Sequence, residues 1–291
     1  MKCDVIIPIT ERNFLMLDLV LSQLRKFIQC KEIYLVGKQE LLGQCEDYAC
    51  RFVDEDRLCD GLSYHTLRAL ITGRDSYAGW RTGWYLQQFL KMSYAFLCRD
   101  EYYLVWDADT VPLTPIDMFD AEGTPYFDVK KEYNKPYFTT LNKLFRGEIK
   151  KTSPYSYISE HMVIKTEYMR NLINEIEENP LLEGTNYFEK VINSIRKADL
   201  MHSGFSEFET YGNYVASRYP GKYRIRELDA LRCGDKYLHY PPAESEIVWA
   251  ANSYHIVTME NRRSMYPEID ENLDEYMQKY SLKELVDRCE K

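Results

Sequence analysis

Two aspartates one residue apart, Asp107 and Asp109, follow the apolar, strand-forming segment YYLVW at residues 102–106. In an extended chain residues i and i+2 point to the same side, so we expect both carboxylates to face one point in space. Pro112 and Pro115 should then end the strand, because proline has no N–H to donate. Hard divalent cations prefer carboxylate oxygens and share them with diphosphates. The motif therefore indicates a metal–diphosphate site; the alternative is a strand followed by an acidic turn.

A second acidic pair, Glu207 and Glu209, stands where a helix is expected to begin. Ser206 and Glu209 have the spacing of a capping box, which predicts a helix to about Arg218 and a Glu209 side chain turned back toward the Ser206 backbone. Glu207 would lie in the first turn, where the helix dipole favours a charged carboxylate. This position suits a catalytic base; the alternative is simple capping.

Polar side chains also gather at the start of the helix expected over residues 82–98. Gln87 and Lys91 share one face at i and i+4, and Gln88 and Arg81 lie close by, beside two tryptophans. This combination suits a diphosphate-sugar pocket; the alternative places the polar face in solvent.

Glu160 and His161 interrupt an apolar segment, residues 156–164, that is expected to form a strand. Charged residues in such a position need partners. The two residues are therefore either a satisfied core pair or part of a site for a second substrate.

The elements that must position these residues alternate between strands and helices in the first half of the chain. Strands are expected at residues 3–8, 32–36 and 50–53, and a helix at residues 14–28. Such alternation predicts a parallel sheet with helices on both faces, whose ligands lie beyond the carboxyl ends of the strands. The residues expected at those ends are Pro8–Asn13, Gly37–Lys38, Asp54 and Asp107–Thr110.

The remaining elements are expected to follow without a break in composition. Further helices are expected at residues 61–72, 166–178 and 185–198, and in a tail from Ile269 with a capping box at Ser281 and Glu284. Further strands are expected at residues 125–129, 223–228 and 254–259. The polar, aromatic segment 133–152 has no clear period and is expected to form a loop over the site.

Composition limits the class of protein. The 291 residues carry a net charge of −9 without a long basic cluster, which argues against nucleic-acid binding. Eight scattered cysteines without Cys-x-x-Cys pairs fit a reducing cytoplasm, and no signal peptide or transmembrane segment is expected. We expect a cytoplasmic protein, with peripheral attachment to the inner face of the membrane left open. An acidic enzyme with an anionic substrate needs a metal to offset the repulsion.

The sequence Val-Trp-Asp107-Ala-Asp109-Thr resembles the Asp-x-Asp motif of the GT-A glycosyltransferases, and is most similar to bacterial enzymes that build surface polysaccharides. The resemblance implies an α/β fold with a GT-A-like (Rossmann-like) mixed, mainly parallel sheet flanked by helices. It implies one domain over residues 1–265, with a nucleotide-sugar half at 1–113 and an acceptor half at 114–265. Residues 266–291 would form a C-terminal helical tail.

The resemblance also implies roles for individual residues. The cofactor would be Mn²⁺ or Mg²⁺, with Asp107, Asp109 and a late histidine, His255, as ligands; from the sequence alone His255 reads as a core residue. The implied donor contacts are Pro8, Thr10, Arg12, Asp54, Arg81, Gln87, Gln88, Lys91 and Asp107. The implied acceptor side holds the catalytic candidates Glu207 and Glu209 together with Glu160 and His161.

The expected function is transfer of a sugar from a nucleoside-diphosphate sugar, UDP-linked by expectation, to a hydroxyl of a glycan or lipid-linked glycan in polysaccharide or glycoconjugate biosynthesis. A sugar nucleotidyltransferase is an alternative, but those enzymes carry a glycine-rich loop after the first strand, and residues 8–13 contain no glycine. A non-catalytic sugar-binding protein is the other alternative.

Overall fold

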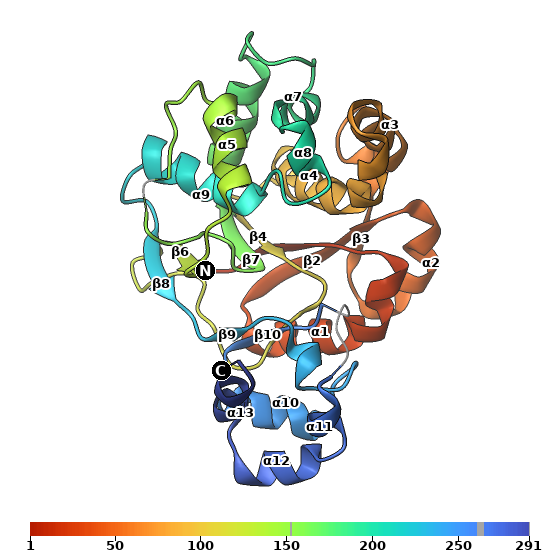
Figure 1. Cartoon of the computed structure of the whole chain (residues 1–291). Helices are drawn as coiled ribbons and strands as arrows, with labels where there is room; N and C mark the ends of the chain where they lie inside the picture. Colours follow the sequence, from red (N-terminus) through yellow and green to blue (C-terminus); the bar gives the residue numbers. More distant parts are fainter. Residues whose placement is uncertain (152, 261–264, 291) are drawn as a thin grey trace.

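A computed structural model describes residues 1–151, 153–260 and 265–290, and at its centre lies a five-stranded sheet (Figure 1). The strand order is β3-β2-β1-β4-β7, with β7 antiparallel to β4 and the other pairs parallel. A second sheet has the order β5-β10-β9, and β6 pairs with β8. The strands are β1 Cys3–Pro8, β2 Cys30–Gly37, β3 Arg51–Asp54, β4 Tyr102–Trp106, β5 Thr110–Pro112, β6 Tyr126–Val129, β7 His161–Lys165, β8 Arg224–Glu227, β9 Ala230–Leu231 and β10 Ile256–Thr258.

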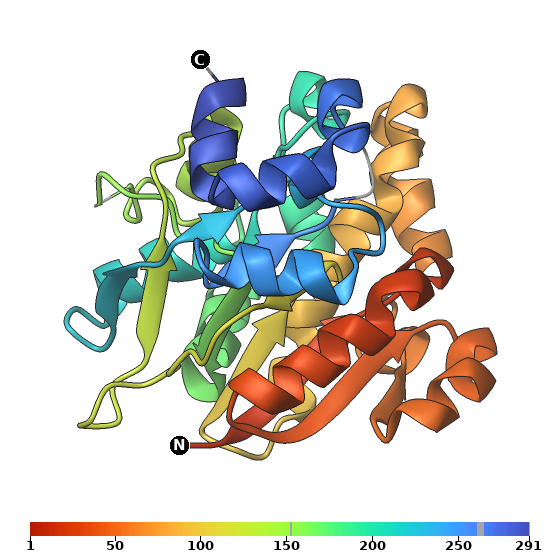
Figure 2. The ribbon, with the colours of Figure 1, turned by 90° about the horizontal axis from the view of Figure 1, so that it is seen from below.

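Helices cover both faces of the central sheet (Figures 1 and 2). One layer contains α3 to α9, and the other contains α1 and α10 to α13. The helices are α1 Phe14–Phe27, α2 Leu42–Cys45, α3 Tyr64–Arg74, α4 Thr82–Leu97, α5 Lys135–Leu144, α6 Thr166–Glu177, α7 Tyr187–Ser194, α8 Lys197–Leu200, α9 Glu207–Arg218, α10 Glu244–Ala251, α11 Pro267–Asp270, α12 Leu273–Lys279 and α13 Leu282–Cys289. No helix within the described residues is both long enough and apolar enough to cross a membrane.

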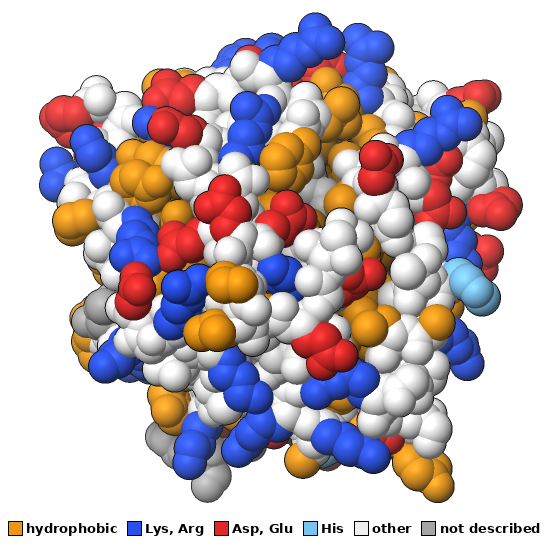
Figure 3. All heavy atoms as spheres, turned by 90° about the horizontal axis from the view of Figure 1, so that it is seen from above, with side chains coloured by type: hydrophobic (Ala, Val, Ile, Leu, Met, Phe, Trp, Pro, Cys, Tyr) orange, Lys and Arg blue, Asp and Glu red, His pale blue; other side chains and the backbone are white. Residues whose placement is uncertain are grey.

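Two hydrophobic cores hold these layers, because alternate residues of β1 and β4 point to opposite faces. Ile6 and Val105 pack with the α3–α9 layer, whereas Val5 and Leu104 pack with α1 and the C-terminal helices. The tail joins the second core through Leu282 and other apolar residues. The outer face of the α3–α9 layer carries interspersed acidic and basic side chains with small hydrophobic groups between them (Figure 3).

The chain reverses its direction across the sheet between β1 and β4. The strands β2 and β3 extend from one side of β1, whereas β4 and β7 lie on its other side. Pro8 and Asp107 each lie two residues beyond the Ile6–Val105 pair of this register. In open α/β sheets ligands bind beyond the carboxyl ends of the strands at such a switch point, so the fold places the aspartate motif at the expected binding position.

The mixed, mainly parallel α/β fold expected from the sequence is confirmed, as are the helices at 14–27, 82–97 and 207–218 and the capping box at Ser281. Two local expectations are wrong, and one helix was missed. The segment 133–152 contains helix α5, because Phe138, Leu141 and Leu144 lie on one face of this helix and pack against the first core. The strand expected over 156–164 begins only at His161. Helix α10 was not expected.

Candidate active site

The aspartate motif forms a turn between the two sheets rather than an extended strand end. Strand β4 ends at Trp106, and the Thr110 N–H donates to the Asp107 carbonyl at 3.1 Å. The Asp107 N–H donates to the Glu160 carbonyl at 3.0 Å, and the Met259 N–H donates to the Asp109 carbonyl at 2.8 Å. The two carboxylates are therefore placed by a turn held from both sides, and the expectation from strand geometry is corrected.

A buried lysine joins this turn to the start of helix α9. The Lys91 ammonium on α4 lies 2.5 Å from Asp107 Oδ1 and 2.8 Å from Glu207 Oε1. Lys91 and Glu207 are 2% and 6% exposed, so little water screens the pair that they form, whereas the Asp107 side chain is 24% exposed. Three candidates from separate parts of the sequence thus form one continuous chain of charges, Asp107–Lys91–Glu207.

This arrangement sets the charge states of its members. Burial acts to lower the pKa of Lys91, but Asp107 and Glu207 outweigh it and raise that pKa, so Lys91 stays charged. Burial raises the pKa of Glu207; Lys91 counteracts this shift, and Asp107 adds to it. A carboxyl group with a raised pKa is a better proton acceptor, which suits a catalytic base.

Asp109 has a different environment, with negative neighbours and no ion-pair partner among the residues that the structure describes. Burial, then the charges of Asp107 and Glu260, raise the pKa of Asp109 to about 7. A cation between the carboxylates of Asp107 and Asp109 would remove this repulsion. The site therefore has the chemistry of a hard-metal site that lacks one positive partner.

The residues present fit a metal held jointly with a substrate. Nowhere in the described part of the chain do three His, Cys, Asp or Glu side chains lie close enough together to hold a metal on their own. Mg²⁺ in nucleotide sites is commonly bound through one or two carboxylates, substrate phosphates and water. Asp107 and Asp109 would supply the two carboxylates.

His255 does not lie at this turn. Strand β10 runs antiparallel to β5 with Thr258 opposite Thr110, so the residues that reach the motif are Met259 and Glu260. The carbonyl of His255 accepts from the Leu113 N–H, at the other end of the pairing. This register corrects the expectation that His255 completes the metal shell.

The two glutamates at the start of α9 point in different directions. Ser206 caps the helix by accepting from the Glu209 N–H at 3.3 Å, as expected. The Glu209 carboxylate does not return to the Ser206 backbone; it accepts from Asn213 Nδ2 at 3.0 Å, one turn further along the helix. Glu207 alone of the pair contacts Lys91.

The other polar residues of the α4 region support the start of α9. Gln88 Oε1 accepts from the Glu207 N–H at 3.2 Å. The Arg81 guanidinium donates to the His202 carbonyl at 2.8 Å and lies 3.9 Å from the Trp84 ring centroid. The side chains of Arg81 and Gln88 are buried, and that of Gln87 is half-buried. Arg81 and Gln88 therefore position the segment that carries Glu207, which differs from the donor contacts expected of them.

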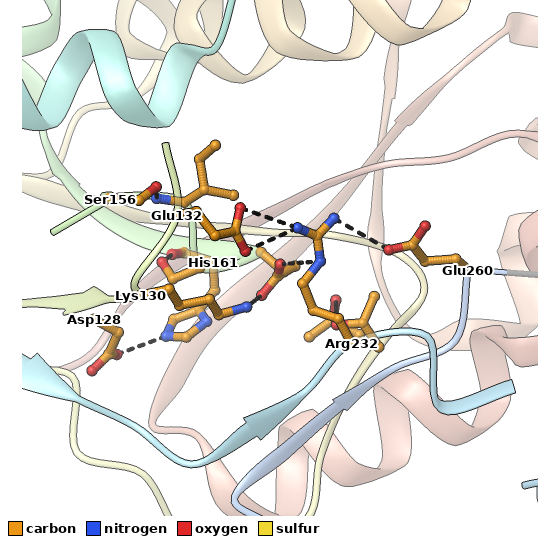
Figure 4. Close-up of polar contacts among 12 residues, drawn as sticks. Asp128, Lys130, Glu132, Ser156, His161, Arg232 and Glu260 are labelled. Carbon is orange, nitrogen blue, oxygen red and sulfur yellow. Dashed lines mark hydrogen bonds and ion pairs between the residues drawn. The ribbon is translucent and has the colours of Figure 1, made fainter. Parts of the chain in front are cut away.

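Glu160 and His161 belong to a polar network at the start of β7 (Figure 4). His161 Nε2 lies 2.8 Å from Asp128 Oδ2, and Arg226 binds both oxygens of Asp128. Glu160 forms ion pairs with Lys130 and Arg232 and has a φ of 59°, a left-handed conformation that is unfavourable for glutamate. His161 is a buried core residue that pairs with Asp128 through Nε2, while its Nδ1 has no hydrogen-bond partner among the described residues; Glu160 supports the aspartate turn through its carbonyl.

The expected nucleotide contacts lie along the carboxyl edge of the sheet. Pro8 ends β1, Thr10 donates to Asn13 Oδ1 at 2.9 Å, and Arg12 is exposed. Asp54 ends β3, accepts from the Asp56 N–H at 3.1 Å and lies 3.4 Å from Arg57. Their placement at one edge agrees with a shared binding surface.

Sequence reasoning missed two charged residues beside the motif, Arg232 and Glu260. Arg232 follows the short strand β9, and Glu260 follows β10. An acidic residue immediately after the last strand was the available signal for Glu260, but only the β5–β10 register shows which residue reaches Asp109.

Removing Lys91 should destabilise the protein strongly. In Lys91→Met, the buried Glu207 and the partly exposed Asp107 would lose their shared cation. Breaking a buried pair by removing one partner costs about 3–5 kcal/mol. The pKa of Glu207 would rise further above its unfolded value, so the loss should be largest at pH 8 and shrink toward pH 5, as the native carboxyl group takes up its proton. Urea unfolding at both pH values measures this. The exposed Lys131→Met is the control; equal, small losses in both variants would contradict the buried pairing.

Glu55 provides a separate pH test at the edge where Asp54 lies. Burial, then the charge of Asp56, raise the pKa of this buried side chain to about 7. A carboxyl group whose folded pKa is raised stabilises the fold as the pH falls from about 7 toward its unfolded value. Glu55→Gln should therefore raise the Tm at pH 8 by about 2–4 °C, the shift that corresponds to about 1 kcal/mol, and change it little at pH 4.5. A lower Tm at pH 8 would show that the charged form is stabilised.

Residues 1–266 match the model of a family described as "Family of unknown function (DUF6492)", and no curated protein matches the chain. Among solved structures the chain is similar to mouse xyloside xylosyltransferase 1 in its apo form, at 13% identity and a TM-score of 0.44, covering 92% of this chain and 100% of that one. It is also similar to apo glycosyltransferase GlyE of Streptococcus pneumoniae TIGR4, at 12% identity and a TM-score of 0.42, covering 97% and 60%. The bifunctional glycosyltransferase WbbM, apo, matches at 11% identity and a TM-score of 0.45, covering 90% and 46%. Identities and TM-scores this low do not assign a function to this chain.

Proposed function

The chain belongs to the DUF6492 family, whose function is unknown, and from its site we propose a metal-dependent glycosyltransferase. It would move a sugar from a nucleoside-diphosphate sugar, with UDP as the expected nucleotide, to a hydroxyl of a glycan or lipid-linked glycan. The product would belong to polysaccharide or glycoconjugate biosynthesis. The cytoplasm, free or at the inner face of the membrane, is the proposed location.

The observation that carries the proposal is the chain of charges Asp107–Lys91–Glu207. It joins an aspartate motif at the switch point of the sheet to an acidic helix start about a hundred residues later in the sequence. One site thereby contains two carboxylates suited to a cation and a third suited to accept a proton. Transfer from a diphosphate leaving group to a hydroxyl needs both functions.

Each residue has a separate task in this proposal. Asp107 and Asp109 would hold Mn²⁺ or Mg²⁺, which when bound supplies a Lewis acid for the leaving diphosphate. Lys91 fixes Asp107 relative to Glu207. Glu207 would accept the proton of the acceptor hydroxyl if the reaction inverts configuration. The nucleotide would lie along the edge formed by Pro8, Thr10, Arg12 and Asp54.

A screen of nucleotide sugars tests the proposal. The Tm of the protein is measured with UDP-, GDP- and CMP-linked sugars in the presence of Mn²⁺, and again with EDTA. A ligand at a hundred times its Kd stabilises the folded state by about 2.7 kcal/mol, so the matching donor should raise the Tm by several degrees only when the metal is present.

The products formed by the matching donor separate the alternatives. Release of nucleoside diphosphate in the presence of Mn²⁺ supports a transferase. Metal-dependent binding without any donor cleavage would instead indicate a sugar-binding protein, and release of diphosphate from a nucleoside triphosphate and a sugar phosphate would indicate a nucleotidyltransferase. Stabilisation that is unchanged by EDTA would contradict the metal site.

A further inference from the structure

Arg232 is shared by three carboxylates from three different segments (Figure 4). Its Nε lies 3.2 Å from Glu160 Oε1, its Nη1 lies 3.2 Å from Glu132 Oε1, and its Nη2 lies 3.2 Å from Glu260 Oε1. Glu160 also pairs with Lys130. Two cations, Arg232 and Lys130, therefore face three carboxylates in this cluster. The Arg232 side chain is 43% exposed.

Two of these carboxylates are tied to the aspartate turn. The Glu160 carbonyl accepts from the Asp107 N–H at 3.0 Å. Glu260 follows Met259, whose N–H donates to the Asp109 carbonyl at 2.8 Å, and the Glu260 N–H donates to Asp235 Oδ1 at 3.2 Å. The backbone of Glu260 is thus fixed beside Asp109, while its side chain is directed to Arg232. Glu132 has no such link to the turn.

The cations around the turn differ in how far a ligand can reach them. Lys91 is 2% exposed and is already held between Asp107 and Glu207. Lys130 pairs with Glu160, and its side chain is 16% exposed. Arg232 presents a planar, partly exposed guanidinium, the group best suited to bind phosphate oxygens in pairs. Of these three described cations, Arg232 is therefore the one that a diphosphate at this turn would meet first.

We propose that Arg232 and Glu260 exchange partners when the metal and the donor bind: Glu260 becomes the third carboxylate around the cation at Asp107 and Asp109 as soon as that cation binds, and Arg232, released from Glu260, binds the donor's diphosphate. The exchange brings Glu260 and Asp109 next to the cation and the diphosphate next to Arg232, while Glu160 keeps Lys130. In the present pairing Asp109 has no ion-pair partner among the residues that the structure describes. This inference rests on the proposed function, and it assigns to Glu260 the place that the sequence suggested for His255.

Three variants of the full chain test the exchange, with Mn²⁺ affinity measured by titration calorimetry without nucleotide. Glu260→Gln should weaken Mn²⁺ binding tenfold or more. Glu132→Gln is the matched control, because it removes the same charge from the same arginine, and it should change the affinity less than twofold. Arg232→Gln frees Glu260 from its competitor and should keep or strengthen Mn²⁺ binding.

Nucleoside diphosphate affinity gives the second measurement. At saturating Mn²⁺, whichever of UDP, GDP and CDP binds the wild type most tightly should bind Arg232→Gln at least tenfold more weakly. The exchange predicts that Arg232→Gln keeps or raises the affinity for Mn²⁺ and lowers the affinity for the nucleotide, since loss of a merely structural residue would lower both affinities. Equal Mn²⁺ affinities of Glu260→Gln and Glu132→Gln, or an unchanged nucleotide affinity in Arg232→Gln, would overturn the inference alone. A wild-type protein that binds no nucleotide with Mn²⁺ would overturn the proposed function as well.

Discussion

Asp109→Asn should abolish metal-dependent donor binding and lower transfer at least about a thousandfold. Asp109 is the carboxylate of the motif that lacks an ion-pair partner in the described structure, so its charge is the one that a cation would neutralise. Loss of about 4 kcal/mol of electrostatic stabilisation of the leaving group corresponds to this factor. Initial rates and Mn²⁺ titrations of the variant provide the measurement.

The stability of the same variant separates loss of function from loss of fold. Burial and two negative neighbours raise the pKa of Asp109 to about 7, so its ionised form disfavours the folded state above that pH. Asp109→Asn should therefore have an equal or higher Tm at pH 8. Asp117→Asn, an exposed change eight residues further on, is the control and should keep its activity. Full activity of Asp109→Asn, or of the wild type in EDTA, would end the proposal of a metal site.

Glu207→Gln should keep donor binding and lose about two to four orders of magnitude in turnover, the usual contribution of a general base. The substitution preserves the shape of the side chain and removes its basicity. Lys91 would still pair with Asp107 at 2.5 Å, so the aspartate turn keeps its cation and the donor site should persist. Turnover and donor Kd are measured together, because a base affects the first and not the second.

Glu209→Gln is the matched control for this prediction. Its carboxylate is bound by Asn213 and burial raises its pKa too, so the two residues differ mainly in direction. Near-normal turnover is expected in Glu209→Gln. A large loss of turnover in Glu209→Gln with little loss in Glu207→Gln would identify Glu209 as the base. Normal turnover in both variants would show that the start of α9 has only a capping role. Because the pKa of Glu207 is raised, wild-type turnover should fall on the acidic side at a pH above that of an ordinary glutamate.

The sequence by itself determined the features that depend on neighbouring residues. The apolar runs of β1 and β4, the helical period of α1 and the cap at Ser206 are local, and the structure contains each of them. The position of the motif at the carboxyl edge of the sheet followed from the alternation of strands and helices, because parallel strands leave their carboxyl ends at one edge. The switch point itself came from the strand order in the structure. The position of the motif at this edge was therefore predictable from the chain itself, whereas the link between the motif and Glu207 was implied only by the family resemblance.

The tertiary structure decided which charges meet. From the sequence Lys91 was a candidate donor contact, with a solvent-exposed position as the alternative. Helix α4 is buried on nearly all sides, so the Lys91 ammonium lies between Asp107 and Glu207. His255 and Glu260 both flank β10, and only pairing with β5 places Glu260 beside Asp109. A strand's own residues do not specify the register with its partner when both strands are short and apolar. Ion pairs between distant segments and strand register are set by the packing of the whole chain, and here they select the residues of the site.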